Sequence, residues 1–308
     1  MTFQFIQYDV ANGYATITLN RPEKRNALSM SLLGELNAAL WEADDDKEVN
    51  AVLIKGAGKD FSTGYDLTPE VVTSVRPKLR QSTYRRGGLY EDDYATLSDD
   101  AWRLEFSQRL RMAIFDMHKP VVARIHGNCL AGGTDVALLC DMLIAADDAR
   151  IGHPAAVDVG TTPNSMWLYH VGPQWAKRMM LTGDTISGAD AAKAGLVMKS
   201  VPAELLDAEV EGLMRKLGKI DSDALRAGKR IINLGLELMG ARTLQRLAAE
   251  NDAQLHTAQV TREFRELVKA EGLNAALAKR RASFPDAQVR FDRPELRDET
   301  GRFLDEGT

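Results

Sequence analysis

Two glycine-bearing segments, each directly after a short apolar stretch, constrain this chain more than any other feature. Residues 60–67 (DFSTGYDL) follow the apolar residues 51–54, and residues 127–135 (GNCLAGGTD) follow residues 121–125. Glycine at the end of a strand lets the backbone approach a ligand, and a following helix directs free N–H groups at negative charge. A pair of such amides forms an oxyanion hole. Either segment alone is also typical of an ordinary turn, so a function requires support from the rest of the sequence.

The N-terminal two thirds of the chain alternate between strand and helix patterns. Residues 3–9 and 14–19 alternate apolar and polar side chains around Gly13, which predicts a hairpin. Two successions of helix and strand follow this hairpin. Helices are predicted at residues 31–43 and 136–139, and strands at 51–54, 121–125 and 142–145. Repeated units of this kind indicate a layered α/β fold.

The last third of the chain is predicted to be helical. After Ala203 the strand signals vanish, and helical periodicity covers residues 205–217, 224–239 and 243–268. We therefore expect a core domain at residues 1–205 that contains the site, and a helical oligomerisation region with a charged tail at residues 206–308. Residues 284–308 are charged and rich in turn formers, and are interpreted as a tail or an arm on a neighbouring subunit.

One internal segment breaks the pattern. Residues 68–100 mix five basic side chains, a Gly-Gly pair and an acidic stretch. Two interpretations stay open: a solvated surface loop, or a segment that covers the site or meets the phosphates of a coenzyme.

Composition excludes several classes of function. The formal net charge is −5, so no overall basic field recruits nucleic acid or anionic lipid. Cys129 and Cys140 belong to no CxxC or His cluster, so neither a disulfide framework nor a zinc site is expected. We find no basic and apolar leader, and no stretch approaching the roughly 18 apolar residues of a membrane span. The sequence predicts a cytoplasmic protein with a small-molecule substrate.

Several motifs together resemble the crotonase (enoyl-CoA hydratase/isomerase) superfamily. The matching segments are residues 20–28 (NRPEKRNAL), 61–67, 119–141, 181–184 (LTGD) and 194–197 (AGLV). The resemblance implies the ClpP/crotonase spiral of repeated ββα units, with C-terminal helices that assemble a homotrimer or a dimer of trimers. It also implies an acyl-CoA substrate and no cofactor besides the coenzyme A of that substrate.

The same resemblance assigns roles to individual residues. The backbone N–H groups of Tyr65 and Gly132 would hold the thioester oxygen, and Asp135 occupies the position where hydratases of the family carry a catalytic glutamate. Lys24 and Arg25 are placed where the family contacts the nucleotide and phosphates of the coenzyme. The other expected substrate contacts are Ala27, Ser62, Gly64, Asp66, Leu67, Gly133, Ala155, Asp158 and Trp167.

The chain departs from the family at its second catalytic acid. Ala155 follows Pro154, where hydratases usually have a second glutamate. Asp158 or His153 is a candidate replacement, although a structural role is the simpler interpretation of both. Trp167 either lines the acyl pocket or packs in the core.

Four functions are compatible with these residues. The first is hydration or dehydration of a 2-enoyl-CoA, in which Asp135 positions water. The second is double-bond isomerisation, for which one acid/base group can suffice. Hydrolysis of the thioester, and weakly catalytic binding of an acyl-CoA, are the remaining two.

Overall fold

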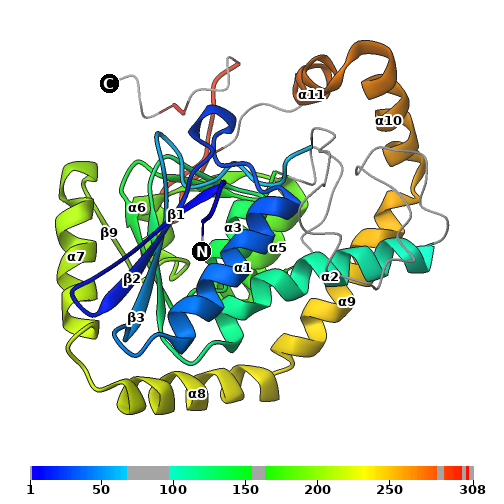
Figure 1. Ribbon diagram of the computed structural model, residues 1–308. Coiled ribbons are helices and arrows are strands. Elements are labelled where there is room, and N and C mark those ends of the chain that lie inside the picture. Colours follow the sequence, from blue (N-terminus) through cyan, green and yellow to red (C-terminus); the bar gives the residue numbers. More distant parts are fainter. Residues whose placement is uncertain (1, 68–96, 155–163, 283–287, 300–302, 305–308) are drawn as a thin grey trace.

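The central element of the protein is a six-stranded sheet (Figure 1). In this computed structural model, residues 2–67, 97–154, 164–282, 288–299 and 303–304 are described. The strand order is β1-β2-β3-β4-β6-β9, with β1 and β2 antiparallel and all other pairs parallel. The strands are β1 (Ile6–Ala11), β2 (Tyr14–Leu19), β3 (Ala51–Gly56), β4 (Val121–Ile125), β6 (Met142–Ala146) and β9 (Lys199–Val201). The predicted hairpin and the predicted strands of this sheet are confirmed.

The hairpin turn explains why glycine follows asparagine between β1 and β2. Asn12 and Gly13 both have positive φ angles, of 55° and 80°. Two such residues in succession suit a two-residue turn whose twist matches that of the flanking strands. The turn fixes the register in which Ala11 pairs with Tyr14.

A second, four-stranded sheet lies beside the first. Its order is β10-β8-β7-β5, and its strands are β5 (Asn128–Leu130), β7 (Arg150–Gly152), β8 (Thr185–Ser187) and β10 (Gln288–Val289). The expectation that no strand follows Ala203 is wrong at β10, which pairs with β8 of its own chain. A two-residue strand leaves no periodicity to detect, because only its tertiary partner defines it.

Helices cover the sheets and continue into the C-terminal region. They are α1 (Met30–Asp45), α2 (Leu97–Asp116), α3 (Gly132–Ala137), α5 (Trp167–Thr182), α6 (Gly188–Lys193), α7 (Leu206–Leu217), α8 (Ser222–Leu238), α9 (Ala241–His256), α10 (Gln259–Glu271) and α11 (Leu273–Arg281). Short 3-10 turns cover Pro22–Lys24 and Ala203–Leu205. Residues 243–268, predicted as one helix, form two, because Ala258 is extended (φ −66°, ψ 154°). The α2 helix was not predicted.

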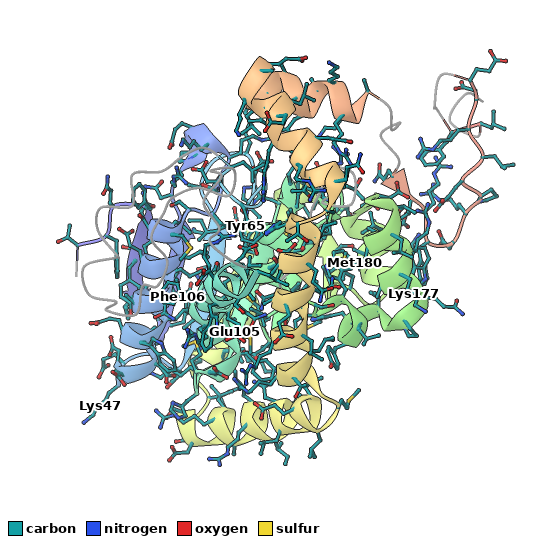
Figure 2. All side chains as sticks on the ribbon, turned by 90° about the vertical axis from the view of Figure 1, so that its right-hand side faces the viewer. Lys47, Tyr65, Glu105, Phe106, Lys177 and Met180 are labelled. Atoms are coloured by element: carbon teal, nitrogen blue, oxygen red, sulfur yellow. The ribbon has the colours of Figure 1, made fainter. Side chains whose placement is uncertain are left out.

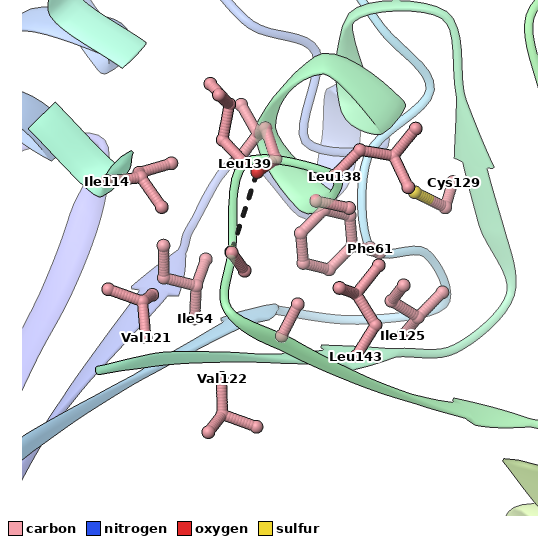
Figure 3. Packing of buried hydrophobic residues seen from close by; sticks show 14 of the residues in the cluster. Ile54, Phe61, Ile114, Val121, Val122, Ile125, Cys129, Leu138, Leu139 and Leu143 are labelled. Carbon is pink, nitrogen blue, oxygen red and sulfur yellow. Dashed lines mark hydrogen bonds between the residues drawn. The ribbon is translucent and has the colours of Figure 1, made fainter. Parts of the chain in front are cut away.

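The main hydrophobic core lies between the large sheet and its helices. Phe61, at the start of the first glycine segment, is fully buried and lies among Leu138, Leu143 and Ile125 (Figure 3). This packing anchors the site loop to the sheet. Burial of a side chain of this size stabilises the fold by about 1.5–3 kcal/mol.

The α7 helix belongs to this same core. Leu206, Val210 and Met214 are each at most 1% exposed and pack in the main cluster. The packing therefore favours a division after α7 rather than after residue 205, and the division itself stays a prediction. No helix in the described ranges is long and apolar enough to cross a membrane.

Candidate active site

The two glycine segments lie side by side at the carboxyl ends of β3 and β4. The N–H of Ser62 donates to the carbonyl of Asn128 at 3.0 Å, and the N–H of Leu130 donates to the carbonyl of Ser62 at 2.9 Å. A third bond joins the N–H of Phe61 to the carbonyl of His126 at 2.9 Å. Segments about 65 residues apart in sequence are thus held in strand-like register.

The site contains two backbone amides without a hydrogen-bond acceptor. Leu28 donates to the carbonyl of Gly64 at 2.7 Å and accepts from the N–H of Asp66 at 3.0 Å, so the N–H of Tyr65 points away from Leu28. Gly132 is the first residue of α3, so its N–H has no partner within the helix. Within the described ranges, neither amide donates to another group. Two such amides suit an oxyanion hole, and these roles of Tyr65 and Gly132 stay predictions.

Close backbone packing explains the glycines and leaves one strained residue. A Cβ on Gly64, whose φ is +104°, would lie 2.8 Å from the Cβ of Ala131 and 3.2 Å from the nitrogen of Gly132. A Cβ on Gly133 would lie 2.6 Å from the carbonyl oxygen of Ser62. Ala131 itself has φ 47° and ψ −121°, a conformation that favours glycine. Contacts with the neighbouring segments, and not the intrinsic backbone preference of alanine, therefore hold the loop in this conformation.

Asp135 lies next to these amides, in the first turn of α3. Its carboxylate is 1% exposed, and its Oδ2 accepts a hydrogen bond from the hydroxyl of Tyr65. The ring of Tyr65 covers Gly132, because a Cβ there would lie 2.8–2.9 Å from Cζ, Cε1 and Cε2 of the ring. Tyr65 thus has both its amide and its side chain at the candidate site. Figure 2 labels the position of Tyr65 among the described side chains.

The surroundings of Tyr65 keep its hydroxyl protonated. Burial raises the pKa of Tyr65 well above its usual value; the Arg111 guanidinium opposes this effect, and the Asp135 carboxylate adds to it. At neutral pH the phenol is therefore a hydrogen-bond donor to Asp135 and not an acceptor.

Comparison with known proteins shows the family of this chain. The sequence matches the family described as enoyl-CoA hydratase/isomerase over residues 9–287. The chain belongs to this family. A probable mitochondrial enoyl-CoA hydratase of Dictyostelium discoideum is 29% identical over 268 residues, covering 86% of this chain and 84% of its own. The resemblance to the crotonase superfamily is confirmed, and the protein is an enzyme of this family.

Solved structures of the family share the fold. A crystal structure of an enoyl-CoA hydratase from Mycobacterium smegmatis has a TM-score of 0.83 at 30% identity, and covers 95% of this chain and 98% of its own. An enoyl-CoA hydratase/isomerase from Xanthobacter autotrophicus Py2 has a TM-score of 0.78 at 34% identity, and covers 92% and 100%. The expected crotonase-like fold is confirmed.

One part of the site in this enoyl-CoA hydratase/isomerase family member was missed by the sequence analysis. Arg111 of α2 is fully buried, and its guanidinium carbon lies 5.3 Å from the centre of the Tyr65 ring. Its Nε donates to Oδ1 of Asn164 at 2.7 Å, and Nδ2 of Asn164 donates to Oε1 of Gln245 at 3.3 Å. This buried polar chain connects the site to α9. The only sequence signal is an arginine among the apolar residues 110–115.

Further along α9, buried charges join it to α2. Nδ1 of His256 lies 2.5 Å from Oδ2 of Asp100, and both residues are less than 8% exposed. Asp252 is buried one helical turn before His256, and its charge also raises the pKa of Tyr65. The C-terminal helix α9 is therefore electrostatically coupled to the site.

Lys24 and Arg25, expected to contact the coenzyme, lie beside the first glycine segment. The N–H of Thr63 donates to the carbonyl of Arg25 at 3.2 Å. Nζ of Lys24 lies 3.2 Å from Oδ2 of Asp66, and Nε of Arg25 lies 2.8 Å from Oδ2 of Asp60. Both cations remain about half exposed while both carboxylates are buried. The cations are therefore positioned by the site loop and reachable from solvent.

The remaining predicted contacts are of two kinds: residues whose side chains or carbonyls bind other parts of the chain, and residues that lie outside the described ranges. Asp66 also binds Arg21 at 2.7 Å, the buried hydroxyl of Ser62 donates to the carbonyl of Asn26 at 2.8 Å, and the carbonyl of Ala27 accepts from Arg21. Trp167 is 1% exposed and packs in the core. Leu67 ends the described part of its loop, whereas Ala155, Asp158 and residues 68–96 lie outside the described residues. Roles of these residues in binding stay predictions.

Two further expectations concern histidine and metal. His153 is 2% exposed, and neither of its ring nitrogens forms a hydrogen bond within the described ranges. Among the described residues, no three His, Cys, Asp or Glu side chains form a group that could hold a metal ion. Cys129 and Cys140 are buried free thiols.

Proposed function

We propose that this protein adds water across the double bond of a 2-enoyl-CoA thioester. One observation carries the proposal: the amides of Tyr65 and Gly132 lie on adjacent loops, without acceptors in the described chain, next to the carboxylate of Asp135. Membership of the enoyl-CoA hydratase/isomerase family supports the same reaction.

Hydration requires one group that stabilises the negative charge on the thioester oxygen and one group that transfers the proton. The oxygen of water bonds to C3 of the enoyl group, while the electrons of the double bond move toward the thioester oxygen. The two amides stabilise the negative charge on that oxygen. Asp135 accepts a proton from the attacking water and delivers a proton to C2, so that one water molecule is added in total.

The missing second glutamate sets the expected rate. Ala155 offers no acid, and a positioned general acid/base contributes about 10²–10⁴ in rate. Each oxyanion donor contributes about 10²–10³. We therefore expect slow hydration of crotonyl-CoA that depends on Asp135. Turnover in the upper part of the usual enzyme range, about 10²–10³ per second, would show that another acid reaches the site.

The test is a panel of enoyl-CoA and acyl-CoA esters, with mass spectrometry to detect water addition, thioester loss or isomer formation. Asp135→Asn keeps the size of the side chain but accepts no proton at neutral pH, and should lower turnover about 10²–10⁴-fold. The matched control is Asp148→Asn on an exposed turn, which should leave turnover unchanged. Full activity of Asp135→Asn would refute the proposed role of Asp135.

The absence of an acid at position 155 gives double-bond isomerisation as a second candidate. One carboxylate can remove a proton at one carbon and return it at another. Incubation of a 3-enoyl-CoA in deuterated water distinguishes the two reactions. Isomerisation gives a product of unchanged composition apart from deuterium, whereas hydration adds the mass of water.

The proposed coenzyme contacts predict that the thioester, and not the free acid, is bound. Lys24 and Arg25 are half-exposed cations at the site loop, which suits the phosphates of a coenzyme. Calorimetry should give a higher affinity for a CoA ester than for its free fatty acid. The double variant Lys24→Gln/Arg25→Gln should reduce that difference, and equal affinities in the parent protein would contradict the prediction.

The apolar face of α8 supports assembly into a trimer or a dimer of trimers. Lys229 is the only buried side chain of this described helix, whereas Ile231, Ile232 and Leu238 are 67%, 67% and 91% exposed. Water-exposed apolar surface of this extent on one helix is typical of an interface. Light scattering should give a mass of three or six chains, and Leu238→Asp should lower it. Leu181→Asp, at a position of α5 that is 76% exposed, is the control.

Two expectations from the sequence complete the proposal. The cytoplasm stays the predicted compartment. The reaction as written uses no cofactor besides the coenzyme A of the substrate, and dialysis against a chelator should leave turnover unchanged.

A further inference from the structure

The side chain of Tyr65 contacts Asp135, the residue proposed to transfer protons. Backbone and side chain of this one residue face the same site: the amide lies beside that of Gly132, and the hydroxyl donates to Oδ2 of Asp135. An oxyanion donor needs only its backbone, so the role proposed above requires no particular side chain at position 65. The phenol is therefore a feature that the proposed function does not explain.

The position of the ring is fixed from two sides. On one side it packs against Gly132, where a Cβ would lie 2.8–2.9 Å from three ring atoms. On the other side the guanidinium of Arg111 lies 5.3 Å from the ring centre, within the range of a cation–π interaction. Arg111 is itself fixed, because its Nε and Nη1 donate to Asn164 at 2.7 Å and Ser107 at 3.2 Å. The hydroxyl therefore reaches Asp135 from a preorganised position.

We propose that Tyr65 is a positioning residue that orients the carboxylate of Asp135. This inference rests on the proposed function of Asp135. An aspartate that works without a second acid depends more on its own orientation, and a misplacement of about 1 Å can cost 10²-fold in rate. The hydrogen bond from the Tyr65 hydroxyl to Oδ2 fixes the direction in which that carboxylate points.

Physical chemistry favours positioning over proton donation by Tyr65. Burial holds the pKa of this phenol well above its usual value, so release of its proton at neutral pH is costly. A phenol that keeps its proton can orient the neighbouring carboxylate through a hydrogen bond without transferring the proton to it.

Other charged and titratable groups also face this pair. Arg111 of α2 and Asp252 of α9 act on Tyr65 with opposite signs, and Cys129 of β5 lies close enough to Asp135 for that carboxylate to help raise its thiol pKa. The test therefore compares variants that differ in the Tyr65 hydroxyl alone.

Tyr65→Phe keeps the amide and the ring and removes only the hydroxyl. With the most reactive enoyl-CoA of the panel, it should lower kcat about 10–100-fold and change KM less than threefold. Tyr8→Phe is the matched control, since Tyr8 of the β1 strand is a half-buried tyrosine whose hydroxyl is buried, and it should change neither quantity.

A purely structural role of the hydroxyl predicts a different result. If Tyr65→Phe keeps kcat within twofold, the proposal is wrong. A fall in kcat that only matches the loss of folded protein, or that comes with an equally large change in KM, also contradicts it; thermal unfolding of both variants monitors the folded fraction.

A second measurement separates this inference from the proposed function. Tyrosine labelled with ¹³C at Cζ gives one signal per residue, and its loss in Tyr65→Phe assigns Tyr65. In Asp135→Asn, the Cζ chemical shift of Tyr65 should change, because its hydroxyl no longer donates to a carboxylate. If no CoA ester is converted but this chemical shift changes, the proposed function fails and the contact stands. An unchanged chemical shift of Tyr65 overturns the inference whatever the activity.

Discussion

Nζ of Lys229 in α8 lies 2.9 Å from Oδ2 of Asp141, the residue before β6. The same ammonium donates to the carbonyls of Ile114 at 2.8 Å and Lys119 at 3.1 Å, and Asp141 accepts from the N–H of Val121 at 2.7 Å. Burial raises the pKa of Asp141, and Lys229 opposes this effect. One side chain therefore fastens α8 to the end of α2 and to the start of β4.

Lys229→Met should destabilise the protein by about 3–5 kcal/mol, because it leaves a largely buried carboxylate and two carbonyls without their cation. Urea denaturation measures the change in the free energy of unfolding. The exposed pair Lys269–Glu266, 3.3 Å apart, provides the control, and Lys269→Met should cost less than about 1 kcal/mol. Equal changes in the free energy of unfolding for the two variants would show that the contact of Lys229 stabilises the protein no more than an exposed ion pair does.

Gly132→Ala should lower turnover about 10²-fold, because the new methyl group overlaps the Tyr65 ring and displaces it from Asp135. The loss should not add to that of Tyr65→Ala. Without the ring, the overlap of the methyl group with the Tyr65 ring disappears. The double variant Gly132→Ala/Tyr65→Ala should therefore be at least about tenfold more active than the product of the two single effects predicts. Strict additivity in steady-state kinetics would contradict the overlap.

Ala131→Gly should stabilise the protein by about 1 kcal/mol. The strain of an alanine at φ 47° costs about 1–3 kcal/mol. Glycine removes this strain but loses about 0.5–1 kcal/mol through greater freedom of the unfolded chain. Chemical denaturation measures the difference. Ala227→Gly, at an exposed position in the interior of α8, serves as control and should destabilise.

Asp60→Asn should reduce the dependence of stability on acid pH. Burial would raise the pKa of Asp60, but hydrogen bonds from Arg25 and Asn128 outweigh it, so the folded-state pKa lies below the ordinary value. The stabilisation is present above the unfolded pKa of about 3.9 and is lost as the pH falls through the folded pKa. Wild type and variant should differ by about 1.5–3 kcal/mol at pH 7 and less at pH 3 in denaturation curves. A constant difference between the two pH values would contradict the linkage.

The sequence predicted those parts of the protein that depend on nearby residues. The β1–β2 hairpin was found because Asn12-Gly13 fits the turn between two alternating segments, and α1 because its apolar residues repeat on one face. The positions of Tyr65, Gly132 and Asp135 came from two local glycine segments and from the resemblance to a family. Backbone amides are insensitive to side-chain identity, so the candidate oxyanion hole needed no knowledge of packing.

Contacts between distant residues were decided only by the tertiary structure. Nothing near Tyr65 in the chain indicates that its hydroxyl donates to Asp135, 70 residues later, or that Arg111 lies over its ring. The chain from Arg111 through Asn164 to Gln245 joins three segments whose polar residues look solvent-exposed in sequence. A hydrophobic pattern reports which face of an element is buried, but a buried polar group is satisfied by whatever partner the docked elements bring to it. For this reason the amides of the site follow from the sequence, whereas the environment of Asp135 follows from the fold.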